Sequence, residues 1–300
     1  MHKEIKGKEH SIITKLEDLG KVKGLVDYIY TYYVIDGFIK RLLISKYQHH
    51  FTLKGAHLLR IHLGETHRFT RDIDFLVRDT SNSIDNIEKI MKGILSIQTN
   101  PTDYITFDIE TIKLIEIDQK AKYPGIRISC TAFIGNIRQM LRVDMGFDDI
   151  ITNKKTCDYR YLLDQNIGSI ACYSLEDLMA EKIEAMINLS LVNSRVKDFY
   201  DVLLISRSMD INGMLLQNAL KNTLANRVTK PFFPEYDDWY IQKYKDQWKG
   251  LIEKNNSKNL ALDFKKALSH IKDFIEPVLV SIQSNDSITK NWNHKDLSWV

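Results

Sequence analysis

Two aspartates separated by one residue, Asp72 and Asp74, form the pair most suggestive of chemistry, and an apolar run at residues 75–77 follows them. In a β-strand, residues i and i+2 point to the same face, so both carboxylates would project together. Two neighbouring anions repel, and a divalent cation such as Mg²⁺ relieves that repulsion. The pair therefore suggests a metal site. Because the pattern is common, a strand end at which both carboxylates simply face water is the alternative.

A third acid, Asp144, lies in the strand-like segment 139–145 with apolar neighbours on both sides. A neighbouring strand could bring it to the pair. Three carboxylates can hold two Mg²⁺ ions about 3.5–4 Å apart, an arrangement that phosphoryl transfer often uses. Asp148 and Asp149 follow closely, and we interpret them as loop acids.

Lys54 and Gly55 stand where a β-prone segment runs into a helix. Glycine lets the backbone approach a phosphate, and a helix N-terminus favours an anion. The Walker A pattern is absent, and a plain turn glycine is the alternative. Thr70 precedes Asp72 by two residues, so its hydroxyl could lie near a metal and a triphosphate. The alternative for Thr70 is an ordinary β-branched strand residue.

The later charged residues Lys182, Arg195 and Asp198 fall in segments with helical periodicity. Asp198 shares a helix face with Asp201, three residues on, and Arg195 precedes Asp198 by three. These groups could serve a reaction, or they could form a local ion-pair network.

The elements that must position these residues follow from periodicity. We expect helices over the first 50 residues, and again at 84–97, 175–191 and 195–206. Strands are predicted at 70–77, 105–117, 125–133 and 139–145, with a turn at 134–136 that makes the last two a hairpin. A polar connection is predicted at 152–160, a mainly helical region beyond it, and frayed structure over the last twenty residues.

This order predicts an α+β fold with a mixed β-sheet core flanked by helices and a C-terminal helical domain. We expect N-terminal helices at 1–50 that pack on the core, the α/β core at 51–160, and the helical domain at 161–300.

Composition excludes wholesale disorder, because 44% of the 300 residues are hydrophobic and 27% are charged. The net charge of +3 is too weak to identify a nucleic-acid partner, but residues 1–60 hold eleven Lys and Arg against six Asp and Glu. Three cysteines without a CxxC pair argue against a disulfide scaffold and a zinc site, and favour a reducing compartment. No apolar run is long enough for a membrane span, so we expect a cytoplasmic protein without a membrane partner.

Taken in order, five segments resemble the AbiEii/AbiGii toxin family, whose members are similar to minimal polymerase-β-like nucleotidyltransferases. They are FTLKGAHLL (51–59), RFTRDIDF (68–75), RVDMG (142–146), SLEDLMAEK (174–182) and RVKDFYD (195–201). The similarity extends over roughly residues 25–210. It implies a nucleotidyltransferase core that uses Mg²⁺ and a nucleoside triphosphate. It also implies the toxin of a bacterial toxin–antitoxin or phage-defence pair, with a cognate antitoxin as partner.

The resemblance also assigns roles to single residues. Gly55 falls in the nucleotide-binding motif, and Asp72 and Asp74 fall on metal ligands. Lys182 and Asp198 fall on the family's later Lys and Asp positions, with Arg195 beside them. Where many members have a second glycine, this chain has Ala56, and the third acid, here Asp144, is less regular in the family.

The mechanism that follows has Mg²⁺ held by the acid pair against the triphosphate. Lys54 and the Gly55 backbone would contact phosphate, and Lys182 would hold the triphosphate or the leaving group. Asp198 would orient the acceptor hydroxyl or Lys182. The family trend and the basic first 60 residues point to an RNA acceptor, most plausibly a tRNA 3′ end. Two alternatives remain open: a non-catalytic module that binds RNA or antitoxin, and a metal-dependent nuclease that uses the same carboxylates.

Overall fold

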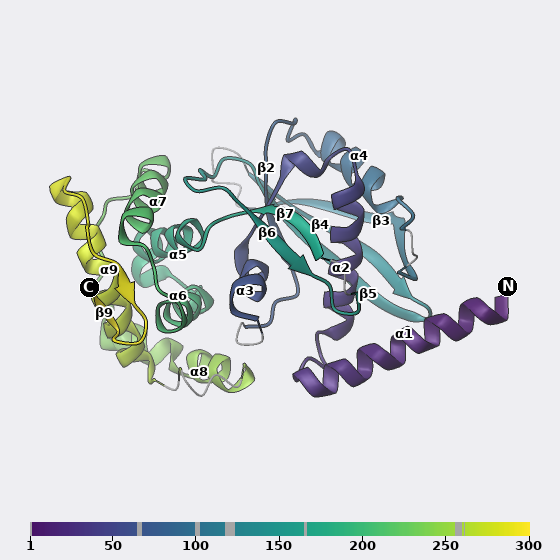
Figure 1. Cartoon of the computed structure of the whole chain (residues 1–300). Coiled ribbons are helices and arrows are strands. Elements are labelled where there is room, and N and C mark those ends of the chain that lie inside the picture. The colour runs from purple at the N-terminus through teal and green to yellow at the C-terminus, as the bar shows by residue number, and fades with distance from the viewer. Residues whose placement is uncertain are drawn as a thin grey trace. The chain divides into compact units, whose positions relative to one another are not determined.

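The computed structural model describes residues 2–64, 68–99, 103–117, 124–164, 167–255, 260 and 262–300. The chain divides into two compact units. The first comprises residues 1–65, 69–148 and 156–172, and the second comprises 66–68, 149–155 and 173–300. The first unit contains a large β-sheet and the second is mainly helical (Figure 1).

The first unit begins with helices, mixes helices and strands in its middle and ends with five consecutive strands. In chain order they are α1 (His2–Lys23), α2 (Ile29–Ile44), the short 3₁₀ helix η1 (Gln48–His50), β1 (Phe51–Lys54), α3 (Gly55–Leu63), β2 (Ile73–Val77), α4 (Ile84–Leu95), β3 (Ile105–Ile117), β4 (Gly125–Ile134), β5 (Ile137–Gly146), β6 (Lys155–Arg160) and β7 (Ile167–Cys172).

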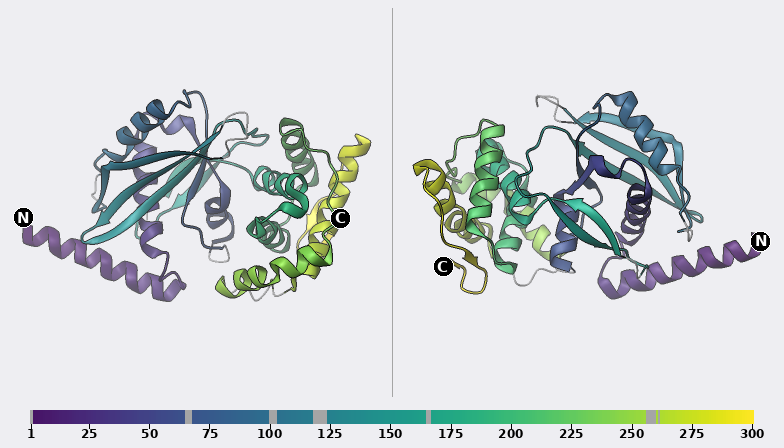
Figure 2. Two further views of the ribbon diagram at one scale, coloured as in Figure 1. Left: turned by 180° about the vertical axis from the view of Figure 1, so that it is seen from behind. Right: turned by 45° about the horizontal axis from the view of Figure 1, so that its top comes forward.

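The sheet is mixed, with the strand order β3-β4-β5-β2-β1-β7-β6. Strand β2 pairs in parallel with β5, and β1 pairs in parallel with β7. The β1/β2, β3/β4 and β4/β5 pairs are antiparallel. Helices α2 and α4 contact each other and pack on the sheet, α2 against β5 and β7 and α4 against β3 (Figure 2). The central strands β5, β2 and β1 therefore lie where the core is deepest.

Strand β2 separates its side chains between the two faces of the sheet. Ile73 and Phe75 are both 0% exposed. The ring of Phe75 lies 6.0 Å, centroid to centroid, from that of Phe38 in α2, so this face is the packed one. Because side chains alternate along a strand, Asp74 projects from the opposite face.

The predicted hairpin is confirmed as β4 and β5. Gly135, with φ of +57°, and Asn136 form its two-residue turn between the paired residues Ile134 and Ile137. Glycine adopts positive φ without the Cβ clash that other residues meet, which suits it to this turn. The ladder continues without a shift to Ile126 and Met145, so the turn sets the register of the whole pair.

The second unit is built from helices. They are α5 (Leu175–Leu189), the 3₁₀ helix η3 (Ser190–Val192), α6 (Val196–Ser208), α7 (Gly213–Asn226), α8 (Asp238–Lys254) and α9 (Phe264–Ser284), followed by the short strands β8 (Trp292–Asn293) and β9 (Ser298–Trp299). Ser174 caps α5, because its hydroxyl accepts a hydrogen bond from the Asp177 backbone N–H at 3.0 Å. Aromatic rings form the core, with Trp248 stacked on Phe264 at 5.1 Å.

Three element predictions need correction. Residues 155–160, predicted as part of a polar connection, form strand β6, and β7 lies beyond residue 160, where we expected the helical domain to begin. Polar residues alternate with the buried Cys157 and Tyr159 in β6, so no apolar run marks it. The last twenty residues include β8 and β9, because Trp292 is buried against Phe274.

The expectation for the cysteines was also wrong in part. Cys157 in β6 and Cys172 in β7 form a disulfide, with their Cα atoms 6.2 Å apart, and Cys130 remains a free, buried thiol. The pairing of β6 with β7 in space brings the two sulfurs together across a sequence separation of 15. Cysteine count and spacing carry no information about that pairing.

The expected fold class is confirmed: a mixed sheet flanked by helices, followed by a helical C-terminal part. Within the described ranges, none of the helices combines the length and the apolar character that a membrane crossing requires.

The cysteines provide a direct test of the fold. Burial raises the pKa of the Cys130 thiol to about 11, and its side chain is 0% exposed. We expect iodoacetamide at about pH 8 to leave Cys130 unmodified in the folded protein and to alkylate it in urea. Non-reducing peptide mapping by mass spectrometry should find Cys157 linked to Cys172. Rapid alkylation of Cys130 in the native protein would contradict its placement in the core.

Candidate functional site

A row of four charged residues crosses four adjacent strands of the first unit. Lys54 of β1 is the register partner of Asp74 in β2, and Asp74 is the partner of Asp144 in β5. Asp144 in turn faces Arg127 of β4. Side chains of register partners lie on the same face of a sheet, so the order across the row is cation, carboxylate, carboxylate, cation. We call these four residues the charge row. The predicted meeting of Asp144 with the acid pair is thereby confirmed as geometry.

Asp72 lies just before β2 and is held by Thr70. The Thr70 hydroxyl donates a short hydrogen bond to the Asp72 carboxylate. The backbone N–H of Thr70 donates to the Tyr32 hydroxyl at 3.2 Å, which ties this segment to α2. Thr70 is 6% exposed. In this structure its hydroxyl therefore orients a carboxylate, and the contact with a nucleotide suggested by the sequence stays a prediction.

Gly55 begins α3 directly beside the Asp74 carboxylate. Its φ is +70°, a conformation in which a Cβ atom is strained. A Cβ added there would also overlap the carboxylate of Asp74. Two independent constraints thus require glycine, and its absent side chain lets the Asp74 carboxylate lie against the N-terminus of α3.

Helix α3 is held in place by buried polar contacts. The Tyr159 hydroxyl donates to Asp36 Oδ1 at 2.7 Å, and Arg60 of α3 donates to the same oxygen at 3.3 Å. His57, also on α3, lies 3.0 Å from the Tyr159 hydroxyl through its Nε2 atom. Burial raises the pKa of Asp36, and Arg60 opposes that rise. These contacts fix the helix whose first residue, Gly55, borders the charge row.

Arg127 binds both oxygens of Asp144. Its Nε donates to Oδ1 at 2.8 Å and its Nη2 to Oδ2 at 2.6 Å. This two-bond geometry is the strong form of an arginine–carboxylate contact. Asp144, and after it Asp72 and Asp74, raise the pKa of Arg127. The guanidinium therefore lies within the electrostatic reach of all three predicted metal ligands.

Lys182 and Asp198 are brought together in the second unit, within a buried ion-pair network. Lys182 Nζ lies 3.0 Å from Asp198 Oδ1 and 2.7 Å from Asp201 Oδ2. Arg68 binds both oxygens of Asp201, at 2.7 and 3.0 Å. Arg195 lies 2.9 Å from Asp198, and its side chain is 59% exposed. The local network considered as an alternative is therefore present.

Charge pairing outweighs burial in this network. Burial lowers the pKa of Lys182, but Asp198 and Asp201 together raise it by more than burial lowers it, so the net shift is upward. Burial raises the pKa of Asp201, but Arg68 and Lys182 together lower it by more than burial raises it, so the net shift is downward. Asp201 therefore adds stability above its ordinary pKa of 3.8, and that stability is lost as the pH falls through its lowered value. Lys182 adds stability below its ordinary pKa of 10.5, which is lost as the pH rises.

The chemistry of the acid pair fits Mg²⁺. The ion usually binds one or two carboxylates together with water and substrate phosphates, and the partly exposed Asp72 and Asp74 offer two such carboxylates. In the part of the chain that the structure describes, no three acidic, histidine or cysteine side chains form a ready metal cluster. The contact of Arg127 with Asp144 bears directly on the third predicted ligand.

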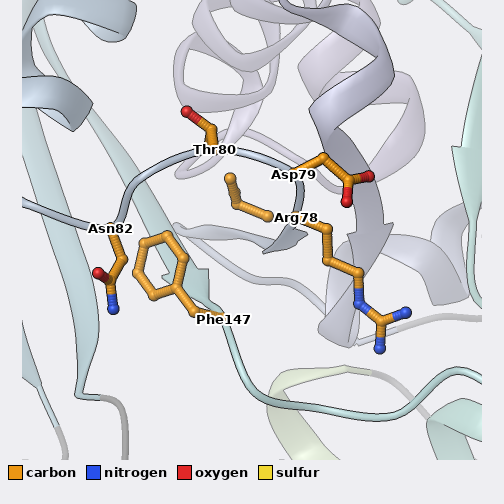
Figure 3. Close-up of a pocket in the computed structure, with 6 residues that line it drawn as sticks. Arg78, Asp79, Thr80, Asn82 and Phe147 are labelled. Atoms are coloured by element: carbon orange, nitrogen blue, oxygen red, sulfur yellow. The ribbon is translucent and has the colours of Figure 1, made fainter.

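A shallow pocket lies at the opposite end of β2 from the acids (Figure 3). Its lining residues are Val77, Arg78, Asp79, Thr80, Asn82 and Phe147. None of them belongs to the charge row or was predicted as a site residue. The arrangement of charges therefore gives a better indication of the site than the shape of the surface does.

Sequence reasoning missed two arginines, Arg127 and Arg68. The signal for Arg127 was available, because a two-residue turn at 135–136 pairs residues whose numbers sum to 271, including Arg127 with Asp144. Nothing in the sequence pairs Arg68 with Asp201, which lies 133 residues away.

Replacing Gly55 tests its close approach to the Asp74 carboxylate. Gly55→Ala should cost about 1–2 kcal/mol of stability from positive φ alone. It should also weaken divalent-ion binding, because the Asp74 carboxylate must shift. The matched control is Gly24→Ala, which has φ of +64° and nothing within 4 Å of the added Cβ. Calorimetric titration and urea unfolding provide the measurements. Equal ion binding in the two variants would contradict the inference that the position of the Asp74 carboxylate beside Gly55 matters for ion binding.

Replacing Lys182 tests the buried network. Lys182→Met leaves Asp198 and Asp201 without their shared cation, and we expect a loss of about 3–5 kcal/mol in the free energy of unfolding. The exposed Lys197 provides the control, because Lys197→Met should stay within about 0.5 kcal/mol of the wild type. Urea unfolding followed by circular dichroism measures both. Wild-type stability in Lys182→Met would show that the network contributes little.

Comparison with known proteins places the chain in a family. The model of the AbiEii nucleotidyl transferase toxins of type IV toxin–antitoxin systems matches residues 37–293. The comparison with curated proteins gives no match. A provisionally assigned nucleotidyltransferase from H. pylori is 12% identical, with a TM-score of 0.46 over 87% of this chain and 99% of that chain. JHP933 from Helicobacter pylori is also 12% identical, with a TM-score of 0.43 over 84% and 91%.

The family match spans most of the chain and includes the charge row and the network around Lys182. The resemblance seen in the five sequence segments is confirmed. The protein belongs to the AbiEii family of nucleotidyl transferase toxins.

Proposed function

We propose that the protein transfers a nucleotide from a nucleoside triphosphate to an acceptor hydroxyl, with Mg²⁺ held by Asp72 and Asp74. One observation carries the proposal: the Asp74 carboxylate lies against Gly55 at the N-terminus of α3, and Asp74 has Lys54 as its register partner. A triphosphate needs cations and backbone N–H groups near a metal-binding pair. Lys54 supplies a cation, and the backbone N–H groups at Gly55 and the start of α3 follow it directly in the chain.

The proposed reaction exchanges one oxygen bond at the α-phosphorus for another. The acceptor oxygen forms a bond to the α-phosphorus, the bond from that phosphorus to the bridging oxygen breaks, and pyrophosphate leaves. The hydroxyl proton passes to solvent. When bound, Mg²⁺ neutralises charge on the transferred group and on the departing pyrophosphate.

Several residues of the chain prepare that step. The Gly55 backbone and Lys54 bind phosphate oxygens, and Thr70 keeps the Asp72 carboxylate in its orientation through their hydrogen bond. Lys182 and Asp198 belong to the proposal as a charged pair required for turnover, which the family resemblance supports. Among the residues around Lys182, Arg195 is the one whose exposed guanidinium is accessible to a nucleotide phosphate.

The acceptor we propose is an RNA, most plausibly a tRNA 3′ end, and the partner that restrains the toxin is its cognate antitoxin. Family membership supports the antitoxin, since the family consists of toxin–antitoxin toxins. The basic first 60 residues support a polyanionic acceptor, because excess positive charge attracts the phosphate backbone.

Incubation with each labelled nucleoside triphosphate, Mg²⁺ and total RNA tests the proposal. Label joined to RNA, with pyrophosphate released, is the expected result. Shortened RNA would show a nuclease, and RNA bound without either change would show a binding module. Sequencing of the labelled RNA ends then identifies the acceptor.

Neutralising either acid should abolish incorporation. Asp72→Asn and Asp74→Asn each remove one charge from a repelling group, so the fold should survive while the metal site is lost. The control is Asp79→Asn, at the far end of β2, where asparagine tolerates the positive φ of 58°. Incorporation assays and thermal unfolding measure the two effects. Full activity in either site variant, or in excess EDTA, would rule out the metal assignment.

A further inference from the structure

The contact between Arg127 and Asp144 is fixed both by side-chain hydrogen bonds and by the register of the backbone. Both Asp144 oxygens receive a hydrogen bond from one guanidinium, at 2.8 and 2.6 Å. The Asp144 side chain is only 13% exposed, and that of Arg127 is 41% exposed. The two residues are register partners in a hairpin whose turn permits one alignment, so the backbone sets the contact before the side chains meet.

This contact competes with metal binding at the third acid. A metal ligand must offer an oxygen lone pair, and Arg127 already occupies both oxygens of Asp144. A second divalent ion at Asp144 would have to break two charge-assisted hydrogen bonds. It would also lie next to a guanidinium that remains positive at any ordinary pH, because its neighbours raise its pKa.

Charge counting points the same way. Asp72, Asp74 and Asp144 carry three negative charges, and Lys54 and Arg127 in the charge row offset two of them. One divalent ion is therefore enough to neutralise what remains. A second ion would leave the site with a large excess of positive charge.

We propose that this protein binds a single divalent ion, at Asp72 and Asp74, and that the Arg127 guanidinium occupies the place at Asp144 where a second ion would bind. The inference rests on the proposed function, since it concerns the metal of that reaction. Asp144 is then a positioning residue for Arg127, in place of the metal ligand expected from the sequence. Arg127 Nη1 makes no hydrogen bond to any described residue, which leaves it able to donate to a substrate oxygen.

Counting bound ions tests the inference without measuring activity. The full-length protein is titrated with Mn²⁺, and free ion is followed by its electron paramagnetic resonance signal. We expect one ion on the wild type, and one on Asp144→Asn, bound more weakly because the charge of Arg127 is then no longer neutralised near the acid pair. Arg127→Gln, which frees Asp144, should bind two ions, and the double variant Arg127→Gln/Asp144→Asn should return to one.

Two further variants control for charge and folding. Arg138→Gln removes another exposed arginine, six residues from Asp144 on the same strand, and should bind one ion. Arg127→Lys keeps the positive charge, and it should also bind one ion. Circular dichroism confirms that each variant is folded before titration.

The outcomes separate the inference from the function on which it rests. Two ions on the wild type, a single ion on Arg127→Gln, or loss of the ion in Asp144→Asn would overturn the inference while leaving a metal-dependent transferase intact. No ion on the wild type would overturn the metal assignment of the proposed function itself. One ion that disappears in Asp72→Asn, together with a second ion gained in Arg127→Gln, would establish both.

Discussion

The repulsion between Asp74 and Asp144, held opposite each other on parallel strands, is the constraint to which the rest of the site responds. Like charges in register destabilise a sheet, so a fold that keeps them must compensate nearby. The first unit does so with cations on both sides, Lys54 on β1 and Arg127 on β4. The site is therefore an electrostatic sequence across the sheet, in which each strand contributes one charge.

The helical unit solves a similar problem with full burial. Lys182 is 7% exposed and is held between two carboxylates, so its charge is stable only while both partners remain. In the charge row Asp74 stays partly exposed, and we propose that it binds a divalent ion together with Asp72. One cluster is thus closed by its own ion pairs, whereas the other keeps a carboxylate that solvent can reach.

Local rules predicted much of this arrangement, and long-range pairing accounts for what they missed. The apolar run that follows Asp74 indicated strand β2, and Gly135-Asn136 indicated the hairpin. Strand β6 was not predicted, because its buried positions are too few to form an apolar run. The disulfide and the contact of Arg68 with Asp201 depend on which distant segments meet, and no local pattern encodes that.

The alternation of side chains in β2 has a consequence for how the toxin can fail. A slip of β2 by one residue would take Ile73 and Phe75 away from the core at α2 and turn Asp74 into it. Removing two large apolar side chains from this core costs about 3–6 kcal/mol, before any cost of burying charge is added. The hydrophobic core therefore also fixes the direction of the Asp74 carboxylate: a chain that has packed β2 correctly has placed this acid on the opposite face, and the slipped register is disfavoured during folding.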